Sequence, residues 1–259
     1  NQVLNNIMSK SKELKIKKDK FVILYRTNAQ SRSLEDRFRR SGIPYQIVGG
    51  TKFYDRKEIK DVLAYLRFLI NDKDSISFAR ILNFPHRGLG KTTLERINLS
   101  AKNNDFIKVL SNPTIKISKN QSKTLKDLSK FFKKYSKQAR IDNPVLVVKD
   151  LVAELELKEY YENQMTSESM DRWKNIEELI FSIEEYINFN QDALLSDYLE
   201  EVSLLTDIDN WNDKDDVITM MTIHSAKGLE FDYVYIVGLE EGLFPMIRVL
   251  DDCDIEEER

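Results

Sequence analysis

Two apolar runs separated by ten mostly polar residues constrain the fold of this chain more than any other feature. The first run contains Val217, Ile218, Met220, Met221 and Ile223, and the second contains Val234, Tyr235, Ile236 and Val237. Nearly continuous apolar runs of this length predict strands that are buried on both faces, as in a parallel sheet. The residues between them would then follow the carboxyl end of the first strand, where open α/β sheets bind ligands.

The segment TIHSAKGLEF at residues 222–231, which overlaps the end of the first run, carries groups that suit a nucleotide. Gly228 allows the backbone to approach a ligand closely, and Lys227 offers a positive charge to a phosphate. Glu230 can accept a hydrogen bond from a sugar hydroxyl. A Lys-Gly pair alone is also typical of an ordinary solvated turn, so the segment indicates nucleotide binding only together with other motifs.

Three further segments supply that context: YRTNAQSR at residues 25–32, GGTKFYDRKEIKDVLAYLR at 49–67, and GLEEGLFP at 238–245. With residues 222–231, these segments make four motifs. In their order along the chain, the four resemble signature motifs of the UvrD, PcrA and Rep group of superfamily 1 DNA helicases. One short motif alone is a weak signal, whereas several in the expected order are specific. The resemblance implies an ATP-dependent helicase that moves 3′ to 5′ on single-stranded DNA and unwinds duplex.

Hydrophobic spacing divides the chain into an α/β part and a helical part. Strands are predicted at residues 21–25 and 45–48 and helices at 33–40 and 58–70, helical spacing then dominates the middle, and the β-rich pattern resumes after Trp211. The resemblance implies an α/β fold in which a partial RecA-like parallel-sheet domain is interrupted by a large all-helical insertion subdomain. We expect residues 1–70 and 212–259 to form the second motor domain and residues 71–211 to form the insertion.

The resemblance also assigns site residues. ATP would contact Lys227, Gly228 and Glu230. Single-stranded DNA would contact Tyr25, Arg26, Thr27, Asn28, Arg32, Lys52, Phe53, Thr222, His224 and Ser225. The Tyr25 ring could stack on a base. Read without the resemblance, Arg32 and Arg37 are surface helix charges paired with Glu35 and Asp36.

The segment RGLGKTT at residues 87–93 looks like the end of a Walker A loop, but Pro85 stands where the first glycine of that motif is required. A helix-hairpin-helix-like turn explains the segment better, because a bend at Gly88 and Gly90 would direct backbone N–H groups at a DNA phosphate. The predicted duplex contacts are Arg87, Gly88, Gly90, Lys91 and Thr92. An ordinary glycine-rich helix turn is the alternative.

The formal net charge of −3 gives no indication of nucleic-acid binding, but the local charge is uneven. Residues 102–140 are rich in lysine and contain only Asp105 and Asp127 as acids. Such a stretch could meet a phosphate backbone or form a solvated helix face.

Cys253 is the only cysteine, and neither a membrane span nor a signal-peptide core is evident, so we expect a cytoplasmic protein. No metal site is predicted, because His86 and His224 lack partners at ligand spacing.

The sequence contains neither a Walker A loop nor an acidic Mg²⁺-binding pair, and the resemblance places an arginine-bearing motif after residue 259. We therefore expect a C-terminal-half fragment that does not hydrolyse ATP alone, with ATP and Mg²⁺ as cofactors of the intact protein. Expected partners are single-stranded and duplex DNA, with repair or replication proteins as candidates. Two alternatives stay open: a fragment of a RecB-type or AddA-type helicase-nuclease, and a non-catalytic DNA-binding or partner-docking module.

Overall fold

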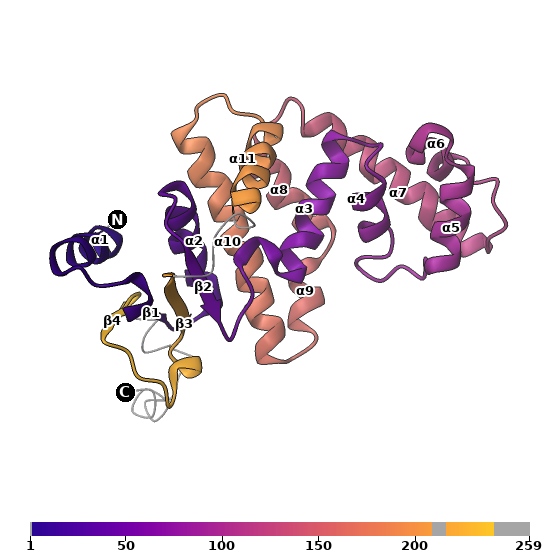
Figure 1. The fold of residues 1–259 in the computed structure, drawn as a ribbon. Coiled ribbons are helices and arrows are strands. Elements are labelled where there is room, and N and C mark those ends of the chain that lie inside the picture. The colour runs from indigo at the N-terminus through magenta and orange to yellow at the C-terminus, as the bar shows by residue number, and fades with distance from the viewer. Residues whose placement is uncertain (1, 209–215, 241–259) are drawn as a thin grey trace. The chain divides into compact units, whose positions relative to one another are not determined.

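The computed structural model describes residues 2–208 and 216–240 (Figure 1). The chain divides into two compact units, of which unit 1 comprises Asn1–Arg56 and Leu204–Arg259 and unit 2 comprises Lys57–Ser203. Parts of the predicted motif at residues 238–245, together with Trp211, Cys253 and the end of the predicted second motor segment, lie outside the described residues.

Unit 1 contains a four-stranded parallel sheet, as the apolar runs predicted. Its strands are β1 (Phe21–Tyr25), β2 (Tyr45–Val48), β3 (Ile218–Thr222) and β4 (Tyr233–Ile236), in the order β2-β3-β1-β4. β1 lies between β3 and β4, so two segments that are nearly 200 residues apart in sequence share one hydrogen-bonded ladder. The sheet therefore brings the carboxyl ends of β1 and β3, where Tyr25 pairs with Thr222, to the same edge.

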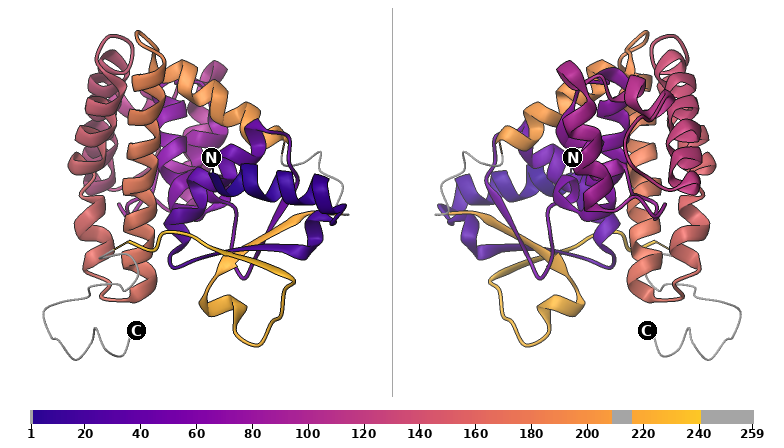
Figure 2. Two further views of the ribbon diagram at one scale, coloured as in Figure 1. Left: turned by 90° about the vertical axis from the view of Figure 1, so that its left-hand side faces the viewer. Right: turned by 90° about the vertical axis from the view of Figure 1, so that its right-hand side faces the viewer.

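One face of the sheet packs against two helices, α1 (Gln2–Leu14) and α2 (Ser31–Arg40) (Figure 2). Leu4 and Ile7 of α1 and Phe38 of α2 belong to the same buried cluster as alternate residues of the strands. The strand members of this cluster are Phe21, Ile23, Tyr25, Tyr45, Ile218 and Met220. Alternate strand residues point to the same face, so this cluster is the hydrophobic core of unit 1.

The other face of the sheet corrects one prediction. β3 is buried along most of its length, as predicted, but β4 is an edge strand whose residues alternate in exposure. Val234 and Ile236 are 49% and 48% exposed. A continuous apolar run could not reveal this difference, because the pattern reports hydrophobicity and not which neighbours cover each face.

Unit 2 is helical throughout its described length. Its longer helices are α3 (Lys57–Ile70), α4 (Ser75–Ile81), α5 (Lys91–Ser100), α6 (Phe106–Ser111), α7 (Lys119–Gln138), α8 (Pro144–Glu154), α9 (Leu157–Glu162) and α10 (Ser167–Phe189). The last α-helix of the described residues, α11 (Leu195–Ile208), includes residues of both units. Short 3₁₀ helices occur at Lys18–Lys20, Asn28–Gln30, Phe53–Asp55, Lys102–Asn104 and His224–Ala226.

The helix α3 belongs to unit 2 and buries almost every residue from Glu58 to Leu69. Our prediction places residues 1–70 in the first motor segment, and that domain assignment stays a prediction. The Phe68 ring lies 5.4 Å from the Phe78 ring of α4 and 4.8 Å from the Phe132 ring of α7, measured between centroids. Whether unit 2 corresponds to the insertion of a motor domain stays a prediction.

None of the helices in ranges 2–208 and 216–240 is both long and apolar enough to cross a membrane. In the same ranges, no group of three or more His, Cys, Asp or Glu side chains could hold a metal ion.

Candidate functional site

The carboxyl edge of the sheet gathers several of the residues predicted to contact single-stranded DNA. Arg26 directly follows β1, and its Nη1 lies 3.0 Å from each ring nitrogen of His224, which follows β3. The Oγ1 of Thr222, the last residue of β3, accepts a hydrogen bond of 3.2 Å from the backbone N–H of Ser225. Since His224 is exposed and the other three are partly exposed, the edge presents a cation, an imidazole and two hydroxyls together.

The turn after β1 is closed by Gln30, a residue that our sequence interpretation did not single out. Its Oε1 accepts hydrogen bonds of 2.9 Å from the backbone N–H groups of both Arg26 and Thr27. A carbonyl oxygen that satisfies two consecutive amides fixes the direction of the chain as it leaves the strand. The spacing of Thr27 and Gln30, which together form a capping box, was the signal available in the sequence.

β2 contributes to the same edge through Gly49, which has a φ of +72°. A Cβ atom at this position would lie 2.6 Å from Ser225 Oγ, so only glycine lets the two segments approach this closely. The next residue, Gly50, lies near the side chain of Asn28, since a Cβ there would be 3.5 Å from Asn28 Oδ1. Residues from β1, β2 and β3 thus converge at one edge.

We expect Gly49→Ala to destabilise the protein by about 2–4 kcal/mol, which adds the cost of a left-handed non-glycine residue to that of overpacking. Gly42→Ala is the matched control, because Gly42 has a φ of +62° and a Cβ there meets no atom within 4 Å. Urea unfolding of both variants separates backbone strain from the contact with Ser225. Equal losses for the two variants would contradict the proposed close approach.

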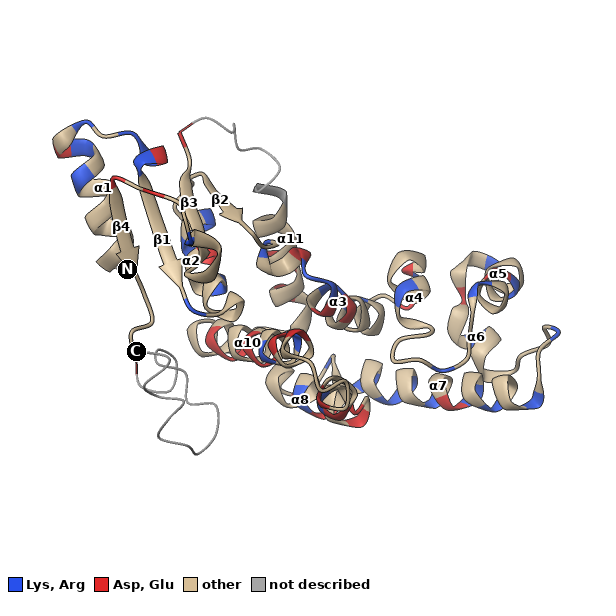
Figure 3. Ribbon diagram, turned by 90° about the horizontal axis from the view of Figure 1, so that it is seen from below, with Lys and Arg blue, Asp and Glu red and all other residues tan. Residues whose placement is uncertain are grey.

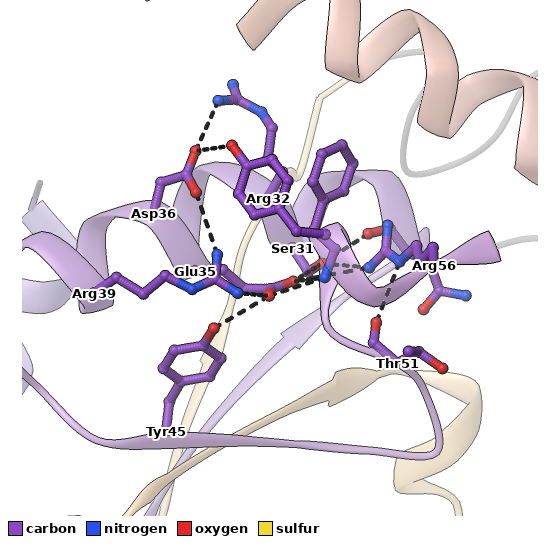
Figure 4. Close-up of polar contacts among 11 residues, drawn as sticks. Ser31, Arg32, Glu35, Asp36, Arg39, Tyr45, Thr51 and Arg56 are labelled. Carbon is purple, nitrogen blue, oxygen red and sulfur yellow. Dashed lines mark hydrogen bonds and ion pairs between the residues drawn. The ribbon is translucent and has the colours of Figure 1, made fainter. Parts of the chain in front are cut away.

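A buried polar network centred on Glu35 fixes the segment that follows Gly49 (Figure 4). Glu35 is 0% exposed and accepts hydrogen bonds from Arg39 Nη2 at 3.0 Å and from the backbone N–H of Phe53 at 3.0 Å. Ser31 and Tyr45 also donate to it, at 2.6 and 3.2 Å. Burial raises the pKa of Glu35 above its ordinary value, while Arg39, Ser31 and Arg56 oppose the rise.

The same network corrects the prediction for Arg32. This side chain is 4% exposed and forms an ion pair of 3.1 Å with Asp36, so it is neither a solvated surface charge nor a ready DNA contact. Asp36 also pairs with Arg39 at 3.3 Å. Of the two interpretations of Arg32, a DNA contact and a surface ion pair, the structure contains the pairing with Asp36. The sequence did not indicate that the pair is buried, because a charged helix is usually solvated.

Two predicted aromatic contacts are also corrected by burial. Tyr25 and Phe53 are both 0% exposed, and Tyr25 belongs to the hydrophobic core. Burial raises the pKa of Tyr25 to about 12. Neither ring is available to stack on a base in this conformation. Lys52, which is also predicted to contact single-stranded DNA, is partly exposed. Its Nζ lies 5.2 Å from the centre of the Tyr45 ring.

The three predicted ATP contacts lie on the segment that connects β3 to β4. Lys227, Gly228 and Glu230 are all exposed, and Gly228 has a φ of +83°. Glu230 lines a depression together with Asp19 and Lys20, which precede β1, and Asp232, which precedes β4. Glu230 therefore lies toward the amino ends of these strands, away from the edge that holds Arg26 and His224.

In unit 2, the segment around Gly88 forms the predicted turn between two helices, α4 and α5. Gly88 has a φ of +70°, and Gly90 is the N-cap residue of α5. The side-chain oxygen of Asn83 accepts hydrogen bonds from the backbone N–H groups of Arg87 and Leu89. Lys91 and Thr92 are exposed at the first turn of α5, where the first backbone N–H groups of a helix point outward; the duplex contact itself stays a prediction.

Arg87 has a different role from the predicted one. Its guanidinium donates to the backbone oxygens of Ile81 and Phe84, at 2.9 and 2.6 Å, and to Tyr65 Oη at 2.7 Å. These bonds satisfy carbonyl groups at the end of α4 and hold the turn. We therefore regard Arg87 as a residue that positions the turn.

Comparison with known sequences identifies the family. The UvrD-like helicase C-terminal domain family matches residues 1–259, the whole chain.

The chain belongs to the UvrD-like helicase C-terminal domain family.

Named relatives of this UvrD-like domain are ATP-dependent DNA helicases called PcrA. The chain is 38% identical over 247 residues to PcrA of Bacillus subtilis (strain 168), covering 92% of this chain and 33% of that protein. It is 39% identical over 265 residues to PcrA of Staphylococcus aureus (strain Mu50), covering 99% of this chain and 36% of that protein. The UvrD-like domain thus spans about a third of the length of these curated relatives.

Proposed function

We propose that this chain works as part of a longer ATP-dependent DNA helicase that moves 3′ to 5′ on single-stranded DNA. In that protein, unit 1 would supply part of the second RecA-like motor domain, with one wall of the ATP cleft and part of the DNA track. Unit 2 would be the helical subdomain that contacts the duplex. The observation that carries the proposal is the convergence of Arg26, Thr222, His224 and Ser225 at one edge of a parallel sheet, in a chain of this family.

The chemistry of this edge suits a DNA backbone. Guanidinium, imidazole and hydroxyl groups donate hydrogen bonds to phosphate oxygens, and such contacts position DNA without reading its sequence. Thr27 and Asn28 are partly exposed on the turn after β1 and would extend the same surface. With Tyr25 and Phe53 buried, we assign the grip of unit 1 to the backbone of the strand and not to stacking on its bases.

The ATP-binding role rests on the segment between β3 and β4. Lys227 would bind a terminal phosphate, Gly228 would let the backbone approach it, and Glu230 would accept from the ribose. The exposure of all three residues leaves them accessible to a nucleotide. Nucleotide turnover also needs a Mg²⁺ ion and a lysine-bearing phosphate loop, and we assign neither to the described residues.

A continuous segment joins the two proposed sites. Thr222, His224 and Ser225 lie at the carboxyl edge of the sheet, and Glu230 lies toward the amino ends of β1 and β4. A change in the position of this segment on nucleotide binding would therefore alter the DNA-facing edge. We infer that this segment couples ATP turnover to the grip on single-stranded DNA.

The duplex-contacting role is tested by DNA binding of the 259-residue chain. We expect it to bind a duplex with a 3′ single-stranded tail more tightly than single strand alone, and to bind less tightly as salt rises. Lys91→Ala should weaken the junction complex about three- to tenfold, since it removes one phosphate contact at the start of α5. Lys158→Ala, at an exposed lysine of α9 outside the turn, is the control for the loss of one charge. A junction preference that is unaffected by Lys91→Ala would remove the turn from the proposal.

A further inference from the structure

Seven lysines recur along α7 at spacings that place them on one face of the helix. They are Lys119, Lys123, Lys126, Lys130, Lys133, Lys134 and Lys137, and we call this set the lysine stripe. At about 100° of rotation per residue, all seven fall within an arc of about 100°. Figure 3 shows basic residues along the length of α7, in contrast to the acidic residues on α8 and α10.

The opposite face of α7 is the buried one. Leu125, Leu128, Phe132 and Tyr135 are at most 5% exposed and pack inside unit 2. The helix is also well anchored at its start, where Ser118 and Gln121 form a capping box. The lysine stripe is therefore a rigid, outward-facing line of charge, about 27 Å long at 1.5 Å per residue.

Most of this charge is not neutralised within the described residues. All seven lysines of the stripe are exposed. Lys130 pairs with Asp127 at 3.5 Å, and Lys134 pairs with Glu154. Across residues 2–208 and 216–240, the side-chain ammonium groups of Lys119, Lys123, Lys126 and Lys137 take part in neither a hydrogen bond nor an ion pair. Exposed pairs such as Lys130 with Asp127 are weak, so the stripe stays strongly cationic.

The lysine stripe is separate from the turn at Gly88. Gln121 Nε2 donates to the backbone oxygen of Gly88 at 3.0 Å, so the turn contacts α7 at Gln121. Gln121 lies about 160–200° around the helix from the centre of the stripe, given about 100° per residue. The turn and the stripe thus occupy different sides of α7.

We propose that the lysine stripe is a second DNA-binding surface, which binds the phosphate backbone of duplex DNA. The inference rests on the proposed function, and it adds a site that the turn does not explain. A straight line of ammonium groups complements a regular line of phosphates, and the stripe carries no aromatic ring on which an unpaired base could stack. The apolar side of α7 is buried, so the helix has no apolar face to insert into a membrane surface.

The test compares two triple variants of the 259-residue chain. Lys123→Gln/Lys126→Gln/Lys137→Gln removes three charges from the stripe, and glutamine keeps the helix propensity of lysine. Lys149→Gln/Lys158→Gln/Lys174→Gln removes the same charge from α8, α9 and α10. Binding to a blunt duplex is measured across a salt series, and circular dichroism checks that both variants fold. Poly-L-glutamate serves as a second, non-nucleic polyanion.

We expect the stripe variant to bind the duplex at least about tenfold more weakly, with the salt slope reduced by about 2 to 3, since each lysine contact contributes about one unit. The control variant should bind within about twofold of the unaltered chain, because a remote charge change acts only through screened interactions. When Lys91→Ala is combined with the stripe variant, the two losses of binding free energy should add, as expected for separate sites.

Equal duplex binding by the stripe and control variants would overturn the inference. The inference would also fail if the stripe variant lost poly-L-glutamate binding as strongly as duplex binding, because that result would indicate an acidic protein partner. If the stripe variant binds duplex normally while Lys91→Ala still weakens the junction complex, the proposed helicase function stands and only the stripe is refuted. A chain that binds no duplex at any salt concentration would also refute the stripe.

Discussion

Replacement of Glu35 by alanine is expected to destabilise the protein by about 3–5 kcal/mol, the cost of removing one partner from a buried ion pair. Glu35 is 0% exposed and accepts from Arg39, Ser31, Tyr45 and the backbone N–H of Phe53. Its loss leaves the Arg39 charge buried with Asp36 as its remaining acidic partner in the network of Figure 4. Urea unfolding followed by circular dichroism measures the change.

Glu13→Ala is the matched control, because Glu13 is an exposed helix residue whose carboxylate accepts a single hydrogen bond from Ser9. Its effect should stay within about 0.5 kcal/mol, as for most surface changes. The double variant Glu35→Ala/Arg39→Ala should lose less stability than the sum of its two single variants, since the pair is coupled. Strict additivity would show that Glu35 and Arg39 do not act as a pair.

Replacement of Lys227 by alanine in the longer helicase is expected to lower the kcat of DNA-stimulated ATP hydrolysis by about 100-fold, the usual cost of removing one transition-state donor. By contrast, Gly90→Val should weaken duplex binding about tenfold, or about 1.4 kcal/mol, and leave single-strand-stimulated hydrolysis nearly unchanged. Gly90 suits this comparison, because a Cβ there meets no atom within 4 Å. Steady-state ATPase assays and duplex-binding titrations measure the two effects.

The pair of variants separates the two proposed sites. Lys227 is exposed on the segment between β3 and β4, and Gly90 caps α5 in unit 2. Glu230→Ala should follow Lys227→Ala, with loss of turnover as the main effect. If Gly90→Val abolished ATP hydrolysis while Lys227→Ala and Glu230→Ala left it intact, the assignment of the two sites would be reversed.

Much of the fold could be predicted from local sequence patterns. The strands predicted at residues 21–25, 45–48 and 217–223 became β1, β2 and β3, and the nearly continuous apolar run at 217–223 correctly indicated a parallel sheet. The three- and four-residue spacing from Ile59 to Ile70 became α3. The turn at Gly88 was also predicted, because glycine and the following helix start are local signals.

The features that were missed depend on contacts between distant segments. Glu35 looked like a surface charge, because nothing near it in sequence reveals that Tyr45 and the backbone of Phe53 enclose it. The burial of Tyr25 and Phe53 follows from the same packing. The sequence predicts Arg87 as a DNA contact, but its guanidinium donates to the backbone oxygen of Ile81 at the end of α4 and to the hydroxyl of Tyr65.

Membership of the family indicates a helicase domain, but it does not say which side chains contact DNA. It supports a DNA helicase C-terminal domain, and the geometry then distinguishes the residues that could serve it. Arg26, His224 and Lys91 keep exposed or partly exposed polar groups, whereas Arg32 and Arg87 are engaged in buried or backbone contacts. Burial thus separates the basic residues that we propose as DNA contacts from those that stabilise the fold.

The most direct test of the central claim is strand separation by the longer protein that contains this chain. A duplex with a 3′ single-stranded tail and one with a 5′ tail are offered with ATP, and displaced strand is measured. The proposal predicts ATP-dependent unwinding of the 3′-tailed substrate and little of the 5′-tailed one. Tight DNA binding with no ATP-dependent unwinding of either substrate would contradict it and favour a non-catalytic DNA-binding module.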